Sequence, residues 1–183
     1  SYYGVTDPHR LQVILAIIKA LQPNSVIIIH RDRDYLSLPE ASEWEQEVRR
    51  LGAEPFITEQ GDIEDYLVRP EYLAEKNANL TVLEASDLMN RSVLHLQNDA
   101  IADYTNGRLE ILRKDRGANI NHGQIAAEAA AAAQNARTML KGKKLRRTMR
   151  RIFQQERGVN LRTEGTSAHL ADGRLAALRA QRP

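Results

Sequence analysis

The sequence contains no cysteine. Without thiols the chain can form neither a disulfide framework nor a thiolate zinc site, and this favours a reducing, cytoplasmic setting. It also lacks a secretory signal and any apolar run long enough to span a bilayer, so we expect no membrane partner. The loop pattern Gly-x-x-x-x-Gly-Lys-Ser/Thr is missing, which excludes ATP binding by that route. The five histidines follow no regular metal-binding spacing.

The 183 residues are enough for one domain, or for a domain with a helical appendage. Because the chain opens at Ser1 and not at a methionine, we expect it to be part of a longer protein. Charge is divided unevenly: residues 1–99 hold 9 Lys/Arg and 17 Asp/Glu, whereas residues 100–183 hold 17 and 7. An acidic half suits cations and a basic half suits polyanions.

Residues 1–78 are predicted to alternate between helix and strand, which indicates the α/β class. Apolar residues at helical spacing predict a helix over 8–21, and an apolar β-branched run predicts a strand from residue 25. A capping-box pattern opens a second helix over 37–51, and a short strand follows at 54–58. A strand, a helix and a strand in about 35 residues form a parallel crossover unit.

Residues 79–183 are predicted to form a mainly helical, basic C-terminal extension. The likeliest interruptions of the helices are Asn106-Gly107 and Arg116-Gly117, because asparagine and glycine favour turns. Near the end, an apolar stripe at helical spacing predicts an amphipathic helix that starts after Gly142. The stripe consists of Leu145, Met149, Ile152 and Phe153.

The end of the first predicted strand carries the clearest chemical signal. The apolar run stops abruptly, and Asp32 and Asp34 follow at positions i and i+2. Ligands of open α/β sheets bind at the carboxyl ends of strands, where two close carboxylates need a cation to offset their repulsion. Oxygen ligands suit Mg²⁺ or Mn²⁺. The alternative is a surface turn in which both aspartates are solvated beside Arg31 and Arg33.

The predicted C-terminal helix is strongly basic on the faces opposite its apolar stripe. Such a face can bind the phosphates of nucleic acid without reading the base sequence. The alternative is an ordinary solvated face, which charge runs usually are. The candidate DNA-binding residues are Lys141, Lys144, Arg146, Arg147, Arg150 and Arg151.

Three segments together resemble the Toprim domain of the overcoming-lysogenisation-defect (OLD) nucleases. They are residues 27–36, 62–67 and 142–145, and the resemblance extends over residues 1–75 and more weakly over 140–170. It implies a Toprim-like parallel sheet with flanking helices in residues 1–78. It also implies a DNA endonuclease that needs Mg²⁺ or Mn²⁺, works with an ATPase domain of the same or a partner chain, and can form homo-oligomers.

The resemblance assigns roles to four residues. Asp32 and Asp34 match the metal ligands of the family, and Glu64 matches a further acidic ligand. Lys143 matches a lysine that approaches the scissile phosphate. In such a site carboxylates hold divalent cations that activate water, and a lysine offsets charge on the phosphorane. Glu64 could instead cap the following turn, and Lys143 could be one more surface cation.

One departure from the family concerns the start of the fold. The family's first strand ends in a catalytic Glu-Gly. Residues 4–7 are the nearest match here, but Tyr3 stands where the glutamate should be, and we interpret Tyr2-Tyr3-Gly4 as the end of the family's second strand. We therefore expect the first strand to lie upstream of this chain, which leaves the metal site incomplete. Two other functions stay open: a catalytically degenerate module that assembles or regulates an ATPase complex, and a phosphohydrolase that acts on small phosphoesters through Asp32.

Overall fold

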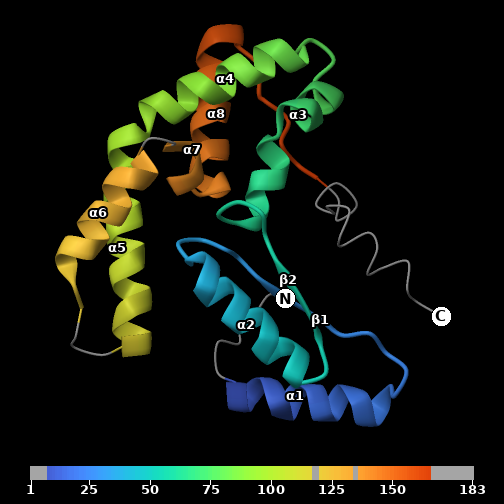
Figure 1. The fold of residues 1–183 in the computed structure, drawn as a ribbon. Coiled ribbons are helices and arrows are strands. Elements are labelled where there is room, and N and C mark those ends of the chain that lie inside the picture. The colour runs from blue at the N-terminus through green and yellow to red at the C-terminus, as the bar shows by residue number, and fades with distance from the viewer. Residues whose placement is uncertain (1–7, 117–119, 134–135, 166–183) are drawn as a thin grey trace. The chain divides into compact units, whose positions relative to one another are not determined.

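The computed structural model describes residues 8–116, 120–133 and 136–165 (Figure 1). These residues are mostly helical and contain one two-stranded parallel sheet, which confirms a mixed α/β class. Over these ranges no helix combines the length and the apolar character needed to cross a membrane. The predicted strand end at residues 2–4 lies outside the described residues.

The chain divides into two compact units. The described part of the first unit comprises residues 8–32 and 37–58. The second unit comprises residues 33–36 and, with the gaps given above, 59–165. This division by spatial contacts differs from the predicted regions 1–78 and 79–183, which stay a prediction.

The first unit is the predicted crossover. Its elements are α1 (Pro8–Leu21), β1 (Ile28–Arg31), α2 (Leu38–Arg50) and β2 (Glu54–Ile57). The two strands are parallel, with Ile28 opposite Glu54 and Arg31 opposite Ile57. Helix α2 begins with the predicted capping box, in which Ser37 and Glu40 bind each other's backbone N–H groups. The small core consists of Leu11, Leu15, Val48 and Ala53, with Ile27, Ile29, Trp44 and Leu51 packed against it.

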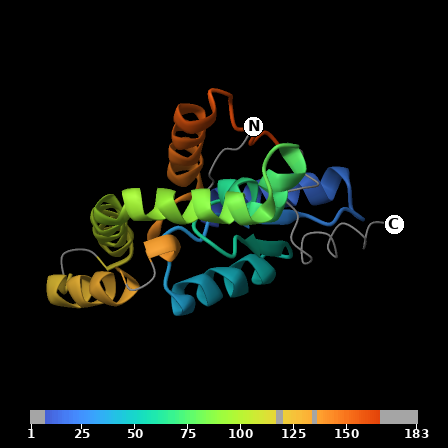
Figure 2. The same cartoon turned by 90° about the horizontal axis from the view of Figure 1, so that it is seen from above.

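The second unit contains the remaining helices. They are the 3₁₀ helix η1 (Ile63–Val68), α3 (Pro70–Lys76), α4 (Val82–His95), α5 (Gln97–Arg116), α6 (His122–Ala132), α7 (Ala136–Met139) and α8 (Gly142–Arg157). Helix α6 lies next to α5 (Figure 1 and Figure 2). The predicted interruption at Asn106-Gly107 is wrong, because α5 continues through both residues. The break comes earlier, at Leu96 between α4 and α5.

The core of the second unit is built on the predicted apolar stripe of α8. Leu145, Met149 and Phe153 are buried, and Ile152 is partly buried against them. This stripe packs on η1 and on α4. An amphipathic helix gains most of its stability from such packing, so the α8 stripe positions the loop before it, residues 140–141, against η1.

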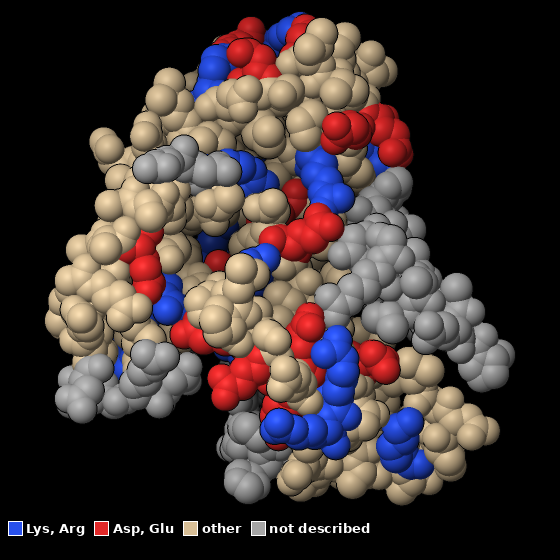
Figure 3. All heavy atoms as spheres, viewed as in Figure 1, with Lys and Arg blue, Asp and Glu red and all other residues tan. Residues whose placement is uncertain are grey.

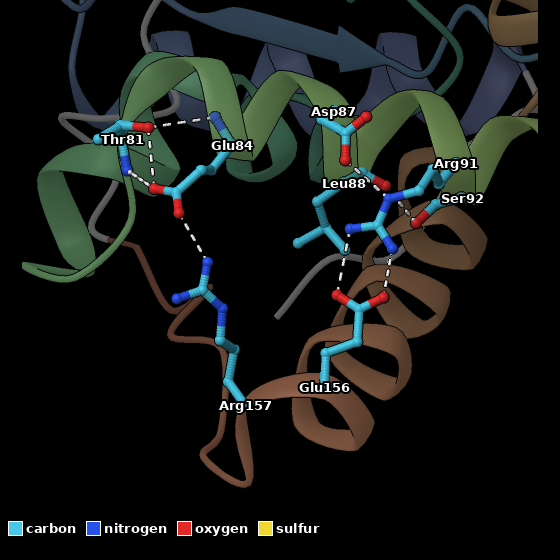
Figure 4. Close-up of polar contacts among 8 residues, drawn as sticks. All are labelled: Thr81, Glu84, Asp87, Leu88, Arg91, Ser92, Glu156 and Arg157. Atoms are coloured by element: carbon cyan, nitrogen blue, oxygen red, sulfur yellow. Dashed lines mark hydrogen bonds and ion pairs between the residues drawn. The ribbon is translucent and has the colours of Figure 1, made fainter.

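Two ion pairs join α4 to the carboxyl end of α8 (Figure 4). The guanidinium of Arg91 binds both carboxylate oxygens of Glu156, and Arg157 donates to Glu84 at 2.6 Å. All four side chains are more than two-fifths exposed, so solvent screens both pairs and each adds little to stability. Their main effect is to fix how the two helices align.

Candidate functional site

Asp32 lies directly after β1, as the sequence predicts. Its carboxylate is 38% exposed, and its Oδ1 is 3.2 Å from Nε2 of His30. The ring of His30 in turn packs against that of Phe56 on β2, with 5.5 Å between the ring centres. Asp32 is thus held at the carboxyl end of a parallel strand and remains open to solvent.

Asp34 belongs to the second unit and occupies a turn. Its φ of 41° lies in the left-handed region, which aspartate tolerates better than most residues. The backbone N–H of Asp34 donates to the carbonyl of Gly61 at 2.6 Å. Its carboxylate faces Lys141, whose Nζ is 3.1 Å from Oδ1. The turn therefore connects Asp34 with two segments that lie far along the chain.

Tyr35 fixes this turn to α5. Its ring packs against Gly107, where an added Cβ would come within 1.9 Å of the ring. The carbonyl of Tyr35 accepts a hydrogen bond from Arg108 at 3.0 Å, and Arg108 is only 4% exposed. Burial, and then the nearby carboxylates, raise the pKa of the Tyr35 hydroxyl. The residue is therefore a neutral structural anchor at ordinary pH.

Two buried carboxylates, Asp62 and Asp65, lie on either side of Glu64. Asp62 and Asp65 are 5% and 3% exposed. Asp62 accepts a hydrogen bond at 3.2 Å from the backbone N–H of Lys143, in the first turn of α8. Lys141, the N-cap residue of α8, makes no capping bond with its side chain. Asp62 therefore caps this helix from a distant part of the chain.

Asp65 forms an ion pair with Arg137. The distance from Nη2 of Arg137 to Oδ1 of Asp65 is 2.6 Å, and the carboxylate is almost fully buried. Burial raises the pKa of Asp65, and the charge and hydrogen bond of Arg137 offset only part of that effect. The other carboxylate oxygen of Asp65 has no hydrogen-bond partner among the described residues. The pair is therefore a costly one to break.

The predicted ligand Glu64 is half-buried, and among the described residues no hydrogen bond or ion pair holds it. Sequence reasoning named Glu64 and missed Asp62 and Asp65 as the structured carboxylates. A signal was present, because residues i and i+3 of a 3₁₀ turn lie on the same side. The spacing of Asp62 and Asp65 therefore indicates one shared face.

Most predicted DNA-binding cations of α8 and its N-cap already have partners within the unit. Lys144 binds Asp103 at 2.8 Å and Asp99 at 3.2 Å, and these contacts, that with Asp103 first, raise its pKa. The others are Lys141 with Asp34, Arg146 with Thr163, Arg150 with Glu164 and Arg151 with His95. Figure 3 shows acidic and basic side chains interspersed on the visible face.

Lys143 and Arg147 differ from these cations. Both are exposed, and within the described part of the chain neither side chain has a hydrogen-bond or ion-pair partner. They lie four residues apart on α8, so they are neighbours on its surface. A phosphate could therefore reach these two cations without first breaking an ion pair.

The described residues hold no group of three or more His, Asp or Glu side chains arranged to bind a metal ion. Of the predicted ligands, Asp34 and Glu64 belong to the second unit and Asp32 to the first. Comparisons with family models, curated proteins and solved structures find nothing that matches this chain. The function is therefore inferred from the residues of the chain itself.

Proposed function

We propose that this chain is the Toprim-like region of a DNA endonuclease that hydrolyses phosphodiester bonds with Mg²⁺ or Mn²⁺. In this proposal it works with an ATPase domain in the same or a partner chain. One observation carries it: in the second unit, three segments separated in sequence converge, namely the Asp34 turn, residues 61–65 and residues 140–143. They overlap the segments on which the resemblance to OLD nucleases rests, which are residues 27–36, 62–67 and 142–145.

The contacts between these segments are direct. Asp34 binds Gly61 through its backbone and Lys141 through its carboxylate. Gly142 packs so closely on η1 that an added Cβ would come within 2.2 Å of the backbone nitrogen of Asp65. Acidic and basic groups therefore meet around one small region, as phosphodiester hydrolysis requires.

The surroundings of the Asp34 carboxylate show how well a divalent cation fits this region. Its Oδ1 is buried, accepts no hydrogen bond and already lies beside a positive charge, that of Lys141. One carboxylate beside a lysine does not by itself make a metal site, and the described residues hold no group of three or more ligands. The proposal takes Asp32 and Glu64 as further ligands from the resemblance alone. A bound Mg²⁺ or Mn²⁺ supplies an activated water and charge stabilisation of the leaving oxygen. Lys143 and Arg147 would contact the DNA phosphates.

The test is cleavage of supercoiled plasmid with Mg²⁺ or Mn²⁺ by the longest natural form of the protein. We expect Asp32→Ala and Asp34→Ala each to lower the rate about a hundredfold or more. Glu71→Ala is the matched control, because Glu71 is exposed on α3 and has no described partner. Intact plasmid with the folded wild-type protein and either metal would refute the proposal.

A second candidate is a non-catalytic module that assembles or regulates an ATPase complex. It is favoured by the neutralisation of Asp34 by Lys141 and by the lack of a three-ligand group among the described side chains. This candidate predicts that Asp32→Ala and Asp34→Ala leave assembly with the ATPase domain unchanged. Size-exclusion chromatography of the complex, with and without ATP, measures that assembly.

A further inference from the structure

Four cations of α8 lie on one face of the helix, because they are spaced at positions i, i+3, i+4 and i+7. They are Lys143, Arg146, Arg147 and Arg150, and we call them the basic stripe. Within the described part of the chain, the side chains of Lys143 and Arg147 have no hydrogen-bond or ion-pair partner. Arg146 and Arg150 instead contact side chains of the segment that follows α8. The stripe is therefore half open and half engaged.

The engaging segment, residues 161–165, lies against α3 and α8, and we call it the strap (Figure 1). Its side chains alternate, because Leu161 and Thr163 are buried whereas Arg162 and Glu164 are exposed. This alternation is typical of an extended chain that lies on a surface. The strap is therefore fitted to the second unit.

The two halves of the strap are held differently. In the first half, Leu161 is 1% exposed, and Asn77 both accepts from the backbone N–H of Arg162 at 2.9 Å and donates to its carbonyl at 3.0 Å. In the second half, the hydroxyl of Tyr72 donates to the carbonyl of Glu164. Because the second half lacks such a paired clamp, it can move while the first half stays in place.

The second half of the strap supplies the contacts to the basic stripe. The Nε of Arg146 donates to Oγ1 of Thr163 at 2.8 Å, and Nη1 of Arg150 lies 3.9 Å from Oε1 of Glu164. The side chains of Arg150 and Glu164 are 44% and 67% exposed, so solvent screens their attraction. A phosphate carries a full negative charge and is a stronger acceptor for Arg146 than a neutral hydroxyl. A phosphate can therefore compete with the strap for both arginines.

We infer that the second half of the strap, residues 163–165, covers part of a DNA-binding stripe on α8 and that DNA phosphates displace it. With the strap in place, DNA reaches Lys143 and Arg147, and once it is displaced DNA also reaches Arg146 and Arg150. This inference rests on the proposed function, because DNA is the polyanion that the nuclease binds. The strap thereby weakens DNA binding until phosphates have replaced it.

The experiment measures binding of a fluorescein-labelled DNA duplex to the full chain by fluorescence anisotropy, with EDTA present to prevent metal-dependent cleavage. Thr163→Val keeps the shape of the side chain and removes the acceptor of Arg146. We expect it to tighten DNA binding about threefold and to steepen the salt dependence by about one phosphate contact. Thr105→Val is the matched control, because this hydroxyl bonds to Ile101 within α5, and it should bind as the wild type does.

Two further variants test the mechanism without a change of charge on the strap. Tyr72→Phe frees the Glu164 carbonyl and should also tighten DNA binding. In the Arg146→Gln background, Thr163→Val should give no gain, because the cation that it frees is missing. Circular dichroism verifies that each variant is folded.

Unchanged affinity in either Thr163→Val or Tyr72→Phe, including no DNA binding at all, would overturn the inference. A gain of Thr163→Val that survives Arg146→Gln would overturn it as well. Plasmid cleavage with Mg²⁺ or Mn²⁺ judges the proposed nuclease separately. Tighter DNA binding without any cleavage would keep the strap and remove the nuclease, whereas cleavage with unchanged binding would remove the strap alone.

Discussion

The ring of Tyr35 lies directly on Gly107 of α5. An added Cβ at position 107 would come within 1.9 Å of Cδ2 and 2.2 Å of Cε2 of Tyr35. The ring of Tyr104, one turn earlier, meets Tyr35 edge to face with 5.7 Å between the ring centres. Only a glycine at position 107 therefore leaves room for the Tyr35 ring, and this close contact holds the turn that carries Asp34.

We expect Gly107→Ala to destabilise the second unit, although alanine favours helix more than glycine does. The new methyl group overlaps the Tyr35 ring, and overpacking of this kind typically costs about 1–3 kcal/mol. Urea unfolding measures the change. Gly123→Ala is the control, because that helical glycine meets only the side-chain oxygen of Asn121, at 3.3 Å. Equal effects of the two substitutions would contradict the explanation that alanine at position 107 overlaps the Tyr35 ring.

Asp62→Ala should destabilise α8, because the helix loses its capping acceptor. Loss of an N-cap costs about 1–2 kcal/mol, and the bond in question joins Asp62 to the backbone N–H of Lys143. Asp62→Asn retains an oxygen acceptor and should recover most of the loss. Lys143→Ala keeps the backbone donor, so its free energy of unfolding should match the wild type. A large effect of Lys143→Ala would argue against capping.

Arg137→Ala should destabilise the protein by about 2–4 kcal/mol at neutral pH, because it leaves Asp65 as an unpaired buried charge. The raised pKa of Asp65 means that the folded state binds this proton more tightly than the unfolded state does. The contribution of Asp65 to stability therefore falls as the pH rises through the interval between the two pKa values.

Without Arg137 the pKa of Asp65 rises further, so the loss should shrink when the protein is acidified below that pKa. Urea unfolding at neutral pH and at an acidic pH measures the difference. Arg147→Ala is the control, because this exposed arginine has no described partner. A loss that is the same at both pH values would mean that Arg137 acts only through packing.

Glu84 should titrate well below an ordinary glutamate. The backbone N–H of Thr81, the guanidinium of Arg157 and the hydroxyl of Thr81, in that order, lower its pKa from 4.5 to about 2. Its stabilising contribution is complete above the ordinary pKa and is lost as the pH falls toward about 2. Carbon-13 NMR of the carboxyl group follows this titration. Arg157→Ala should raise the pKa of Glu84 more than Thr81→Ala does, and the reverse order would contradict the contacts in Figure 4.

Local patterns predicted the elements of this fold well. The crossover of β1, α2 and β2, the capping box at Ser37 and the apolar stripe of α8 all depend on residues within a few positions of one another. The wrong prediction of a helix interruption at Asn106-Gly107 has a specific cause. Glycine next to asparagine favours a turn, but here the missing side chain serves the close approach of Tyr35.

The candidate site was predicted less completely. The sequence indicated the Asp-x-Asp pair, the acidic segment 62–67 and the basic start of α8. It did not indicate that Asp62 caps α8 across 81 positions, or that Asp65 pairs with Arg137 across 72. Residue type alone made Glu64 as plausible a ligand as Asp62 or Asp65. Which of these carboxylates is buried depends on what packs against each side chain.

The sequence by itself determined the α/β class, the order of the elements and the apolar faces, because hydrophobic periodicity and caps act over one or two turns. Only the tertiary structure decided which carboxylates are buried, which cations are neutralised and which lysine faces Asp34. Those choices depend on contacts between residues that are distant in the sequence, such as Asp65 with Arg137 and Asp62 with Lys143. They are set by the packing of α8 and α5 against the turns, and that packing is a property of the folded chain as a whole.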